Sequence, residues 1–353
     1  MADTLKRLGM YDEAIRIYSE IIKTQSKILG PDHPDTLDTR HFMADAFKYQ
    51  DKYEEAYQIY KDILEIRNAV LGPEHPITLY SKHSVADVLE SLKRYGEAYQ
   101  IYNEVLKSRN AVLGPEHHYV LSTKSNVADV LVCQEKYEEA FGIYSEILEI
   151  QNEIIGPDHP DTLATKYKVA CVWEILKKYE EAYKIYNEVL ERRITVLGPE
   201  HRITLITKHS LANILEIQER YEEAYRIYSE VLEGRSKVLG SEHSSTLETK
   251  DKLAFVLIMQ RKYKEAFKMY NEILQTRTRI LGAEHPTTLT TKNKTADVLQ
   301  CQRRYEEAYR IYSEVLAIRS VVLGPEHRST LATKHSMADV LKFQARYERK
   351  KQI

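Results

Sequence analysis

The stretch Pro76–Gly114, PITLYSKHSVADVLESLKRYGEAYQIYNEVLKSRNAVLG, has the pattern of two consecutive amphipathic helices. Apolar residues at helical spacing in its first half predict a helix of about four turns; they are Leu79, Val85, Ala86 and Leu89. The same spacing predicts a second helix, through Tyr95, Ala98, Tyr99, Tyr102, Val105 and Leu106. Gly114 and Pro115 end it, because glycine tolerates a left-handed conformation and proline cannot continue the helix. The unit is predicted to be an antiparallel helix pair.

This unit recurs every 42 residues. A Tyr-x-x-Ala motif marks each second helix, at Tyr11, Tyr53, Tyr95, Tyr137, Tyr179, Tyr221, Tyr263 and Tyr305. An alanine marks each first helix, at Ala44, Ala86, Ala128, Ala170, Ala212, Ala254, Ala296 and Ala338. Neither helix can bury its apolar face alone, so the pairs must stack. We predict an all-α protein, an α-solenoid of stacked antiparallel helix pairs, with one continuous array over 1–353, eight 42-residue periods and partial helices at both ends.

Composition narrows the function classes. The 353 residues include 51 Lys and Arg against 53 Asp and Glu, a net charge of −2, so the basic excess of a nucleic-acid binder is missing. No apolar run approaches the roughly 20 residues of a membrane span, and Met1–Met10 contains charges and no apolar core, unlike a signal peptide. Three scattered cysteines predict no disulfide framework. A cytoplasmic protein without nucleic-acid partner or membrane insertion is expected.

The repeat resembles a known family. Ala86, the motif Tyr95-x-x-Ala98 and Tyr102 resemble the core of a tetratricopeptide repeat, a helix–turn–helix unit ordinarily about 34 residues long. The longer unit, with Leu71-Gly72-Pro73-Glu74-His75-Pro76 between pairs, resembles the repeats of kinesin light chains and nephrocystin-3-like proteins, and the sensor arrays of some signalling NTPases. The resemblance covers the whole chain and implies a right-handed α-solenoid that binds proteins.

The sequence departs from kinesin light chains in places. Those proteins carry a heptad coiled coil before their repeats, and this chain has none. Their first helices typically read Leu-Asn-Asn-Leu-Ala, whereas Lys82–Ala86 reads Lys-His-Ser-Val-Ala. The turn within a pair, often glycine in the family, is Gly9 and then Asp51, Lys93, Glu135, Lys177, Glu219, Arg261, Arg303 and Ala345. If that position is left-handed, each non-glycine residue costs roughly 1 kcal/mol relative to glycine.

Phased histidines invite a metal interpretation. They are His33, His75, His117, His159, His201, His243, His285 and His327. Each stands in an inter-unit loop, one repeat from the next, whereas zinc needs three or four converging ligands. We therefore expect these side chains to hydrogen-bond or cap the following helix, and no metal or other cofactor is predicted.

No catalytic signature appears. Cys133, Cys171 and Cys301 lie in first helices without a marked base, and we expect Cys133 and Cys301, which share one position of the repeat, to be buried as small apolar residues. Glutamate pairs such as Glu54-Glu55 recur at helix N-termini, where the helix dipole favours them. A phosphate loop, nucleophile elbow and HExxH motif are all missing from the sequence. The chain is predicted not to be an enzyme.

Binding is expected where the repeats differ. First helices are predicted to line a concave groove, and positions that vary there between units are candidates for ligand contact. These candidate peptide-binding residues are Lys82, His83, Asp87, Lys124, Asn126, Asp129, Lys166, Tyr167, Lys208, His209, Asn213, Lys250, Asn293 and Asp297. Their mixed charge favours a polar peptide that carries some acidic residues.

Two functions remain open. The first is a non-catalytic scaffold that binds partner peptides in its groove. By resemblance, that scaffold would be a kinesin-light-chain-like adaptor between cargo and a microtubule motor, with kinesin heavy chain or cargo as partner. The second is the sensor or regulatory repeat region of a larger signalling (STAND-type) ATPase.

Overall fold

The structure is a computed structural model that describes residues 4–5 and 10–351. In that part of the chain every regular element is an α-helix, which confirms the predicted all-α class. The second helices are α2 (Tyr11–Ile28), α4 (Tyr53–Leu71), α6 (Tyr95–Leu113), α8 (Tyr137–Ile154), α10 (Tyr179–Leu197), α12 (Tyr221–Leu239), α14 (Tyr263–Leu281) and α16 (Tyr305–Val322). The first helices are α3 (Pro34–Tyr49), α5 (Pro76–Ser91), α7 (His118–Cys133), α9 (Pro160–Ile175), α11 (Arg202–Ile217), α13 (Ser244–Met259), α15 (Pro286–Cys301) and α17 (Arg328–Lys351).

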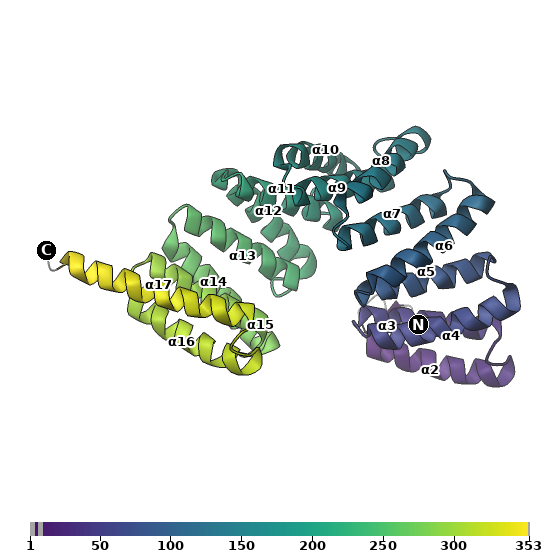
Figure 1. Ribbon diagram of the computed structural model, residues 1–353, viewed down its shortest axis with the longest axis horizontal. Helices are drawn as coiled ribbons and strands as arrows, with labels where there is room; N and C mark the ends of the chain where they lie inside the picture. Colours follow the sequence, from purple (N-terminus) through teal and green to yellow (C-terminus); the bar gives the residue numbers. More distant parts are fainter. Residues whose placement is uncertain (1–3, 6–9, 352–353) are drawn as a thin grey trace. The chain divides into compact units, whose positions relative to one another are not determined.

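The chain divides into two compact units, Met1–Lys177 with α2–α9 and Lys178–Ile353 with α10–α17. Within each unit, every helix packs against its neighbours in the sequence. Figure 1 shows these helices stacked side by side in each unit, which is the arrangement of an α-solenoid. That residues 1–353 form one continuous array stays a prediction.

Both rows of alanine lie at helix–helix contacts. Ala86 on α5 and Ala98 on α6 have no exposed surface, and the same is true of their equivalents from Ala14 to Ala308. Alanine has no side-chain volume beyond Cβ, so the helix axes can approach closely at these positions. Ala338 is exposed, because no helix follows α17 in the described chain to cover it.

Each inter-unit loop ends on a histidine that caps the next helix. The His75 Nδ1 accepts a hydrogen bond from the Ile77 backbone N–H at 3.3 Å. Equivalent bonds of 3.1–3.3 Å are made by His33, His117, His159, His201, His243, His285 and His327. Such an acceptor satisfies an N–H group that has no partner inside the helix. The capping prediction is confirmed.

The turn within each pair is left-handed. Its residue has a φ of 60–64° at Asp51, Lys93, Glu135, Lys177, Glu219, Arg261 and Arg303. Each of these residues therefore carries a conformational free-energy cost that glycine would avoid. Gly9, the first residue of the series, lies outside the described residues.

The last turn does not form, contrary to the sequence prediction. Ala345 lies inside α17, which runs unbroken from Arg328 to Lys351, so the turn expected at Ala345, and with it a separate partial helix after that turn, is wrong. A continuous helix avoids placing alanine in a left-handed conformation.

The burial predicted for Cys133 and Cys301 is wrong. Cys133 and Cys301 are exposed, and Cys171 is half-buried. Cys133 and Cys301 are the last residues of α7 and α15, where the helix ends and one side faces solvent. Ile175 and Ile217, at the same position in other units, are more than 40% exposed. An apolar residue at a helix end is therefore no sign of burial in this chain.

Candidate functional site

Four cavities lie between successive first helices, on one face of the stack within each unit. They have volumes of about 510 Å³ between α3 and α5, 450 Å³ around α5 and α7, 730 Å³ between α7 and α9, and 310 Å³ between α13 and α15. We call this surface the groove face. It carries the candidate residues His83 and Asp87, both of which line the first of these cavities.

Four of the candidate peptide-binding residues accept hydrogen bonds from buried tyrosines of the second helices. Tyr102, on α6, is fully buried and its hydroxyl donates to Asp87 Oδ1 at 2.5 Å. The equivalent bonds join Tyr144 to Asp129 at 2.5 Å, Tyr228 to Asn213 at 2.6 Å and Tyr312 to Asp297 at 2.5 Å. Burial and the adjacent carboxylate raise the pKa of the Tyr102 hydroxyl. These aspartate and asparagine side chains therefore bond to the core as well as lying on the groove face.

The structure brings three predicted residues together. Asn126 Nδ2, on α7, lies 3.1 Å from His83 Nε2 and 3.4 Å from Asp87 Oδ1, both on α5. Lys48, on α3, reaches the other Asp87 oxygen at 3.3 Å. Burial lowers the pKa of His83 despite its proximity to Asp87. This contact links three successive first helices through one carboxylate.

Similar polar bonds join other first helices in both units. Lys168, on α9, donates to Asp129 at 2.6 Å and to Ser125 at 2.8 Å. In the second unit, Lys252 donates to Glu216 at 3.1 Å, and Lys294 donates to Asp251 at 2.5 Å. Lys168, Lys252 and Lys294 occupy the same position in later repeats as Asn126. Of these four residues, only Asn126 was predicted as a candidate. We call these bonds the polar ladder.

The candidate lysines of the first helices lie apart from the ladder. Lys82 donates to Glu104 at 3.3 Å, Lys124 to Glu146 and Lys208 to Glu230 at 2.6 Å each, and Lys250 to Glu272. In each case the glutamate belongs to the second helix of the same pair. These ammonium groups therefore point away from the neighbouring first helix. Lys166 and Tyr167 lie on α9 and are half-buried.

His209 and Asn293 complete the predicted set. His209, on α11, is 7% exposed, and its ring lies edge-on to Tyr228 at 5.4 Å. Burial, with the nearby charges of Arg235 and Lys252, lowers the pKa of His209 to about 3. Asn293, on α15, has a buried Oδ1 that finds no hydrogen-bond partner among the described residues.

A row of arginines beneath the groove face was missed by sequence reasoning. It comprises Arg67, Arg109, Arg193, Arg235, Arg277 and Arg319, one in each of six second helices. Arg67 is 3% exposed and donates to Asp38 at 2.5 Å and Ser81 at 2.7 Å. Arg109 donates to Thr123 at 2.7 Å and has no carboxylate partner in the described chain; burial lowers its pKa. The repetition of arginine at one position of the second helices was the sequence signal that could have identified this row.

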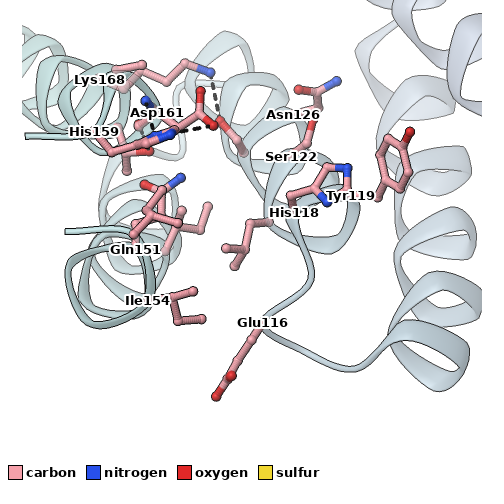
Figure 2. Close-up of a pocket in the computed structure, with 16 residues that line it drawn as sticks. Glu116, His118, Tyr119, Ser122, Asn126, Gln151, Ile154, His159, Asp161 and Lys168 are labelled. Atoms are coloured by element: carbon pink, nitrogen blue, oxygen red, sulfur yellow. Dashed lines mark hydrogen bonds and ion pairs between the residues drawn. The ribbon is translucent and has the colours of Figure 1, made fainter. Parts of the chain in front are cut away.

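Two units have glutamine in that row, at Gln25 and Gln151. Gln151, on α8, is 7% exposed and lines the 730 Å³ cavity. Figure 2 shows the cavity walls, with Gln151, His159 and Asp161 on one side and Ser122 and His118 on the other. The buried Oε1 of Gln151 has no hydrogen-bond partner in the described chain. This is the largest of the four groove-face cavities.

The repeat family follows from the sequence together with this arrangement. The tetratricopeptide repeat family matches the chain in eight overlapping segments: 1–69, 42–111, 78–140, 119–174, 172–237, 204–279, 245–302 and 288–349. The chain is a tetratricopeptide repeat protein. Tetratricopeptide repeats generally act as protein-interaction scaffolds that bind proteins or peptides, and the fold is typically non-catalytic.

Solved structures share the fold at low identity. The TPR-like repeats of a Podosopora anserina protein designated a kinesin light chain are 24% identical, with a TM-score of 0.54 over 58% of this chain and 97% of that one. The apo form of RapI is 14% identical, with a TM-score of 0.60 over 97% of this chain and 95% of that one. The Pyrococcus horikoshii STAND protein PH0952, which has a tetratricopeptide repeat sensor, is 14% identical with a TM-score of 0.58, over 86% of this chain and 45% of that one. A search of curated proteins found no match.

Two searches of the described residues bear on other functions. No group of three or more His, Cys, Asp or Glu side chains there could hold a metal ion. Among the same residues, no helix has the length and apolar character needed to cross a bilayer.

Proposed function

We propose that the tetratricopeptide repeat protein is a non-catalytic scaffold that binds a partner peptide along the groove face of its first helices. The observation that carries the proposal is the series of cavities between successive first helices, from about 310 to 730 Å³. Concave sites with a few placed polar groups are where proteins usually hold ligands. The candidate residues His83, Asp87 and Asn126 stand in or beside these cavities.

The partner is a protein segment with polar and some acidic residues. Ammonium groups of the polar ladder, such as Lys168 and Lys252, alternate with carboxylates along the groove face. Mixed charges favour a partner of complementary pattern over a uniform polyanion. The specific role we propose is a cytoplasmic adaptor similar to a kinesin light chain, with kinesin heavy chain or cargo as partner.

A second candidate function is the sensor region of a larger STAND-type ATPase. It is favoured by the similarity to PH0952, in which the matching part is 45% of that chain. The gene's adjoining sequence distinguishes the two roles. A phosphate-binding loop in the same protein would support the sensor, and a heptad coiled coil would support the adaptor.

Site-specific photo-crosslinking tests the groove face. A benzophenone side chain replaces Tyr80 on α5 or Ile206 on α11, both exposed at equivalent first-helix positions, one in each unit. Controls carry it at Lys107 on α6 and Glu191 on α10, which are exposed positions of second helices. After irradiation in cell lysate, mass spectrometry should identify one partner captured from Tyr80 and Ile206 and not from the controls. Capture from the second-helix positions alone would refute the proposal.

A further inference from the structure

We propose that the cavity around Gln151 is a subsite for a guanidinium group, carried by an arginine side chain of the bound peptide. The inference rests on the proposed function, because that peptide supplies the arginine. It comes from a comparison of repeats within this chain. In six other units an arginine of the chain itself occupies the corresponding place.

The chain's own guanidinium groups show what acceptors such a group uses. In every case Nη1 donates to a hydroxyl 14 residues further on, at 2.5–2.8 Å: Arg67 to Ser81, Arg109 to Thr123, Arg193 to Thr207, Arg235 to Thr249, Arg277 to Thr291 and Arg319 to Thr333. The same nitrogen reaches a backbone carbonyl ten residues on, as Arg235 does to Ser245 at 2.8 Å. In Arg319, Nη2 donates at 3.0 Å to Thr290, 29 residues earlier.

The same acceptors surround Gln151. At the three corresponding spacings stand the Thr165 hydroxyl, the Asp161 carbonyl and the Ser122 hydroxyl, and all three residues line the cavity. Thr165 is buried and its hydroxyl donates to the Asp161 carbonyl at 3.2 Å, as the equivalent hydroxyls do in other units. Gln151 adds its own unpartnered Oε1. A buried acceptor without a donor is unfavourable, so an incoming N–H group would be favoured here.

The space is open because two neighbouring side chains are small. Ser122 and Ala164 occupy a first-helix position at which other units have Tyr80, Ile206 or Glu248. Both line the cavity around Gln151. The small residues and the shorter glutamine together leave about 730 Å³, which exceeds the other three groove-face cavities.

The charge of the cavity suits a cation. Its one lysine, Lys168, is already bound to Asp129 at 2.6 Å. His159 accepts the Asp161 N–H at Nδ1, and the Asp161 carboxylate is 69% exposed at the cavity wall, 3.8 Å from the same ring. Glu116 also lines the cavity and is a second acidic residue there. A planar guanidinium has five N–H donors in a fixed fork, which matches several acceptors at once, whereas an ammonium is a compact point charge.

Binding of a peptide-like arginine is the direct test. N-acetyl-arginine amide and N-acetyl-lysine amide are titrated into the full chain at equal ionic strength, and binding is followed by saturation-transfer NMR. The arginine probe should bind about tenfold more tightly than the lysine probe, since charge-assisted bonds to several acceptors distinguish the two. Equal affinities would overturn the proposal. Agmatine, a free guanidinium amine, should not exceed the arginine probe; stronger agmatine binding would overturn the assignment to a peptide side chain.

Substitutions locate the subsite. Gln151→Arg supplies the residue that six other units carry and should abolish arginine-probe binding while the circular dichroism spectrum is retained. Ser122→Tyr, which introduces the residue found at Tyr80, should do the same from the opposite wall. Gln25→Arg makes the identical change in the other glutamine unit and should leave binding unaltered. Probe binding that survives both Gln151→Arg and Ser122→Tyr refutes the subsite. Capture of the partner from Tyr80 and Ile206 would still stand in that case, so the two proposals can fail separately.

Discussion

At the scale of the single residue, Glu90 makes the stability of the fold depend on pH. Burial on α5, followed by the nearby Asp129 and Asp87 carboxylates, raises its pKa to about 7. In the unfolded chain this carboxyl has its ordinary pKa of 4.5. The folded state therefore binds this proton more tightly than the unfolded chain does. The resulting contribution to the free energy of unfolding is fully present below pH 4.5 and is lost as pH rises through about 7.

We predict that the free energy of unfolding falls between about pH 5 and pH 8, and that Glu90→Gln makes it flatter over this range. Urea unfolding followed by circular dichroism at each pH measures the change. Glu97→Gln is the matched control, since Glu97 is exposed and its hydrogen bond to Arg94 lowers its pKa, which places its effect in more acidic solution. An unaltered slope in Glu90→Gln would show that other groups cause the pH dependence.

At this scale, repetition made some roles predictable and left others hidden. The histidine caps could be predicted because eight copies stand at one loop position before a helix. The first-helix residues Asp87 and Asp129 were identified, but their bonds to buried tyrosines were not, because sequence spacing does not show which helix faces which. The buried arginines were overlooked for a physical reason. A charged residue on a helix is usually solvated, and burial becomes favourable only when acceptors such as Thr123 and Thr249 surround it.

At the scale of the helix, glycine substitutions separate helix propensity from packing. Gly142 lies in the interior of α8, and a Cβ built there meets no atom within 4 Å. Gly142→Ala should raise the free energy of unfolding by about 0.5–1 kcal/mol, because glycine loses more backbone entropy in a helix than alanine.

Gly234, on α12, is the contrasting position. A Cβ there would lie 2.7 Å from Leu205 Cδ2, and Leu205 is itself buried. Gly234→Ala should therefore gain clearly less than Gly142→Ala, or lose stability, because overpacking offsets the propensity gain. Chemical denaturation of both variants gives the comparison. Equal gains would mean that Leu205 moves aside without cost.

Helix positions were largely predictable, since a 42-residue period fixes every boundary by analogy with the others. The exception was α17, where the period wrongly predicts a turn at Ala345. The period takes no account of which residue stands at each turn position. In α17 that residue is alanine, which favours a continuous helix over a left-handed turn.

At the scale of the whole molecule, the two units should be separable. Each has core clusters of its own, such as Ala14, Tyr18 and Ala46 in the first unit and Ala296, Leu299 and Tyr312 in the second. Repeat arrays are stabilised mainly by contacts between neighbours. We predict that fragments 1–177 and 178–353 each give a helical circular dichroism spectrum and unfold cooperatively on heating. A fragment without helical signal would show that its folding depends on the rest of the chain.

The histidine caps have a cumulative consequence for the whole array. Each imidazole accepts its capping bond through the Nδ1 lone pair. Loss of one N-cap costs about 0.5–2 kcal/mol, which a single helix can tolerate. In this chain eight first helices depend on the same acceptor. A change that removed this acceptor from every copy would weaken the starts of all eight helices together, so duplication of the repeat has also multiplied the dependence of the fold on one kind of hydrogen bond.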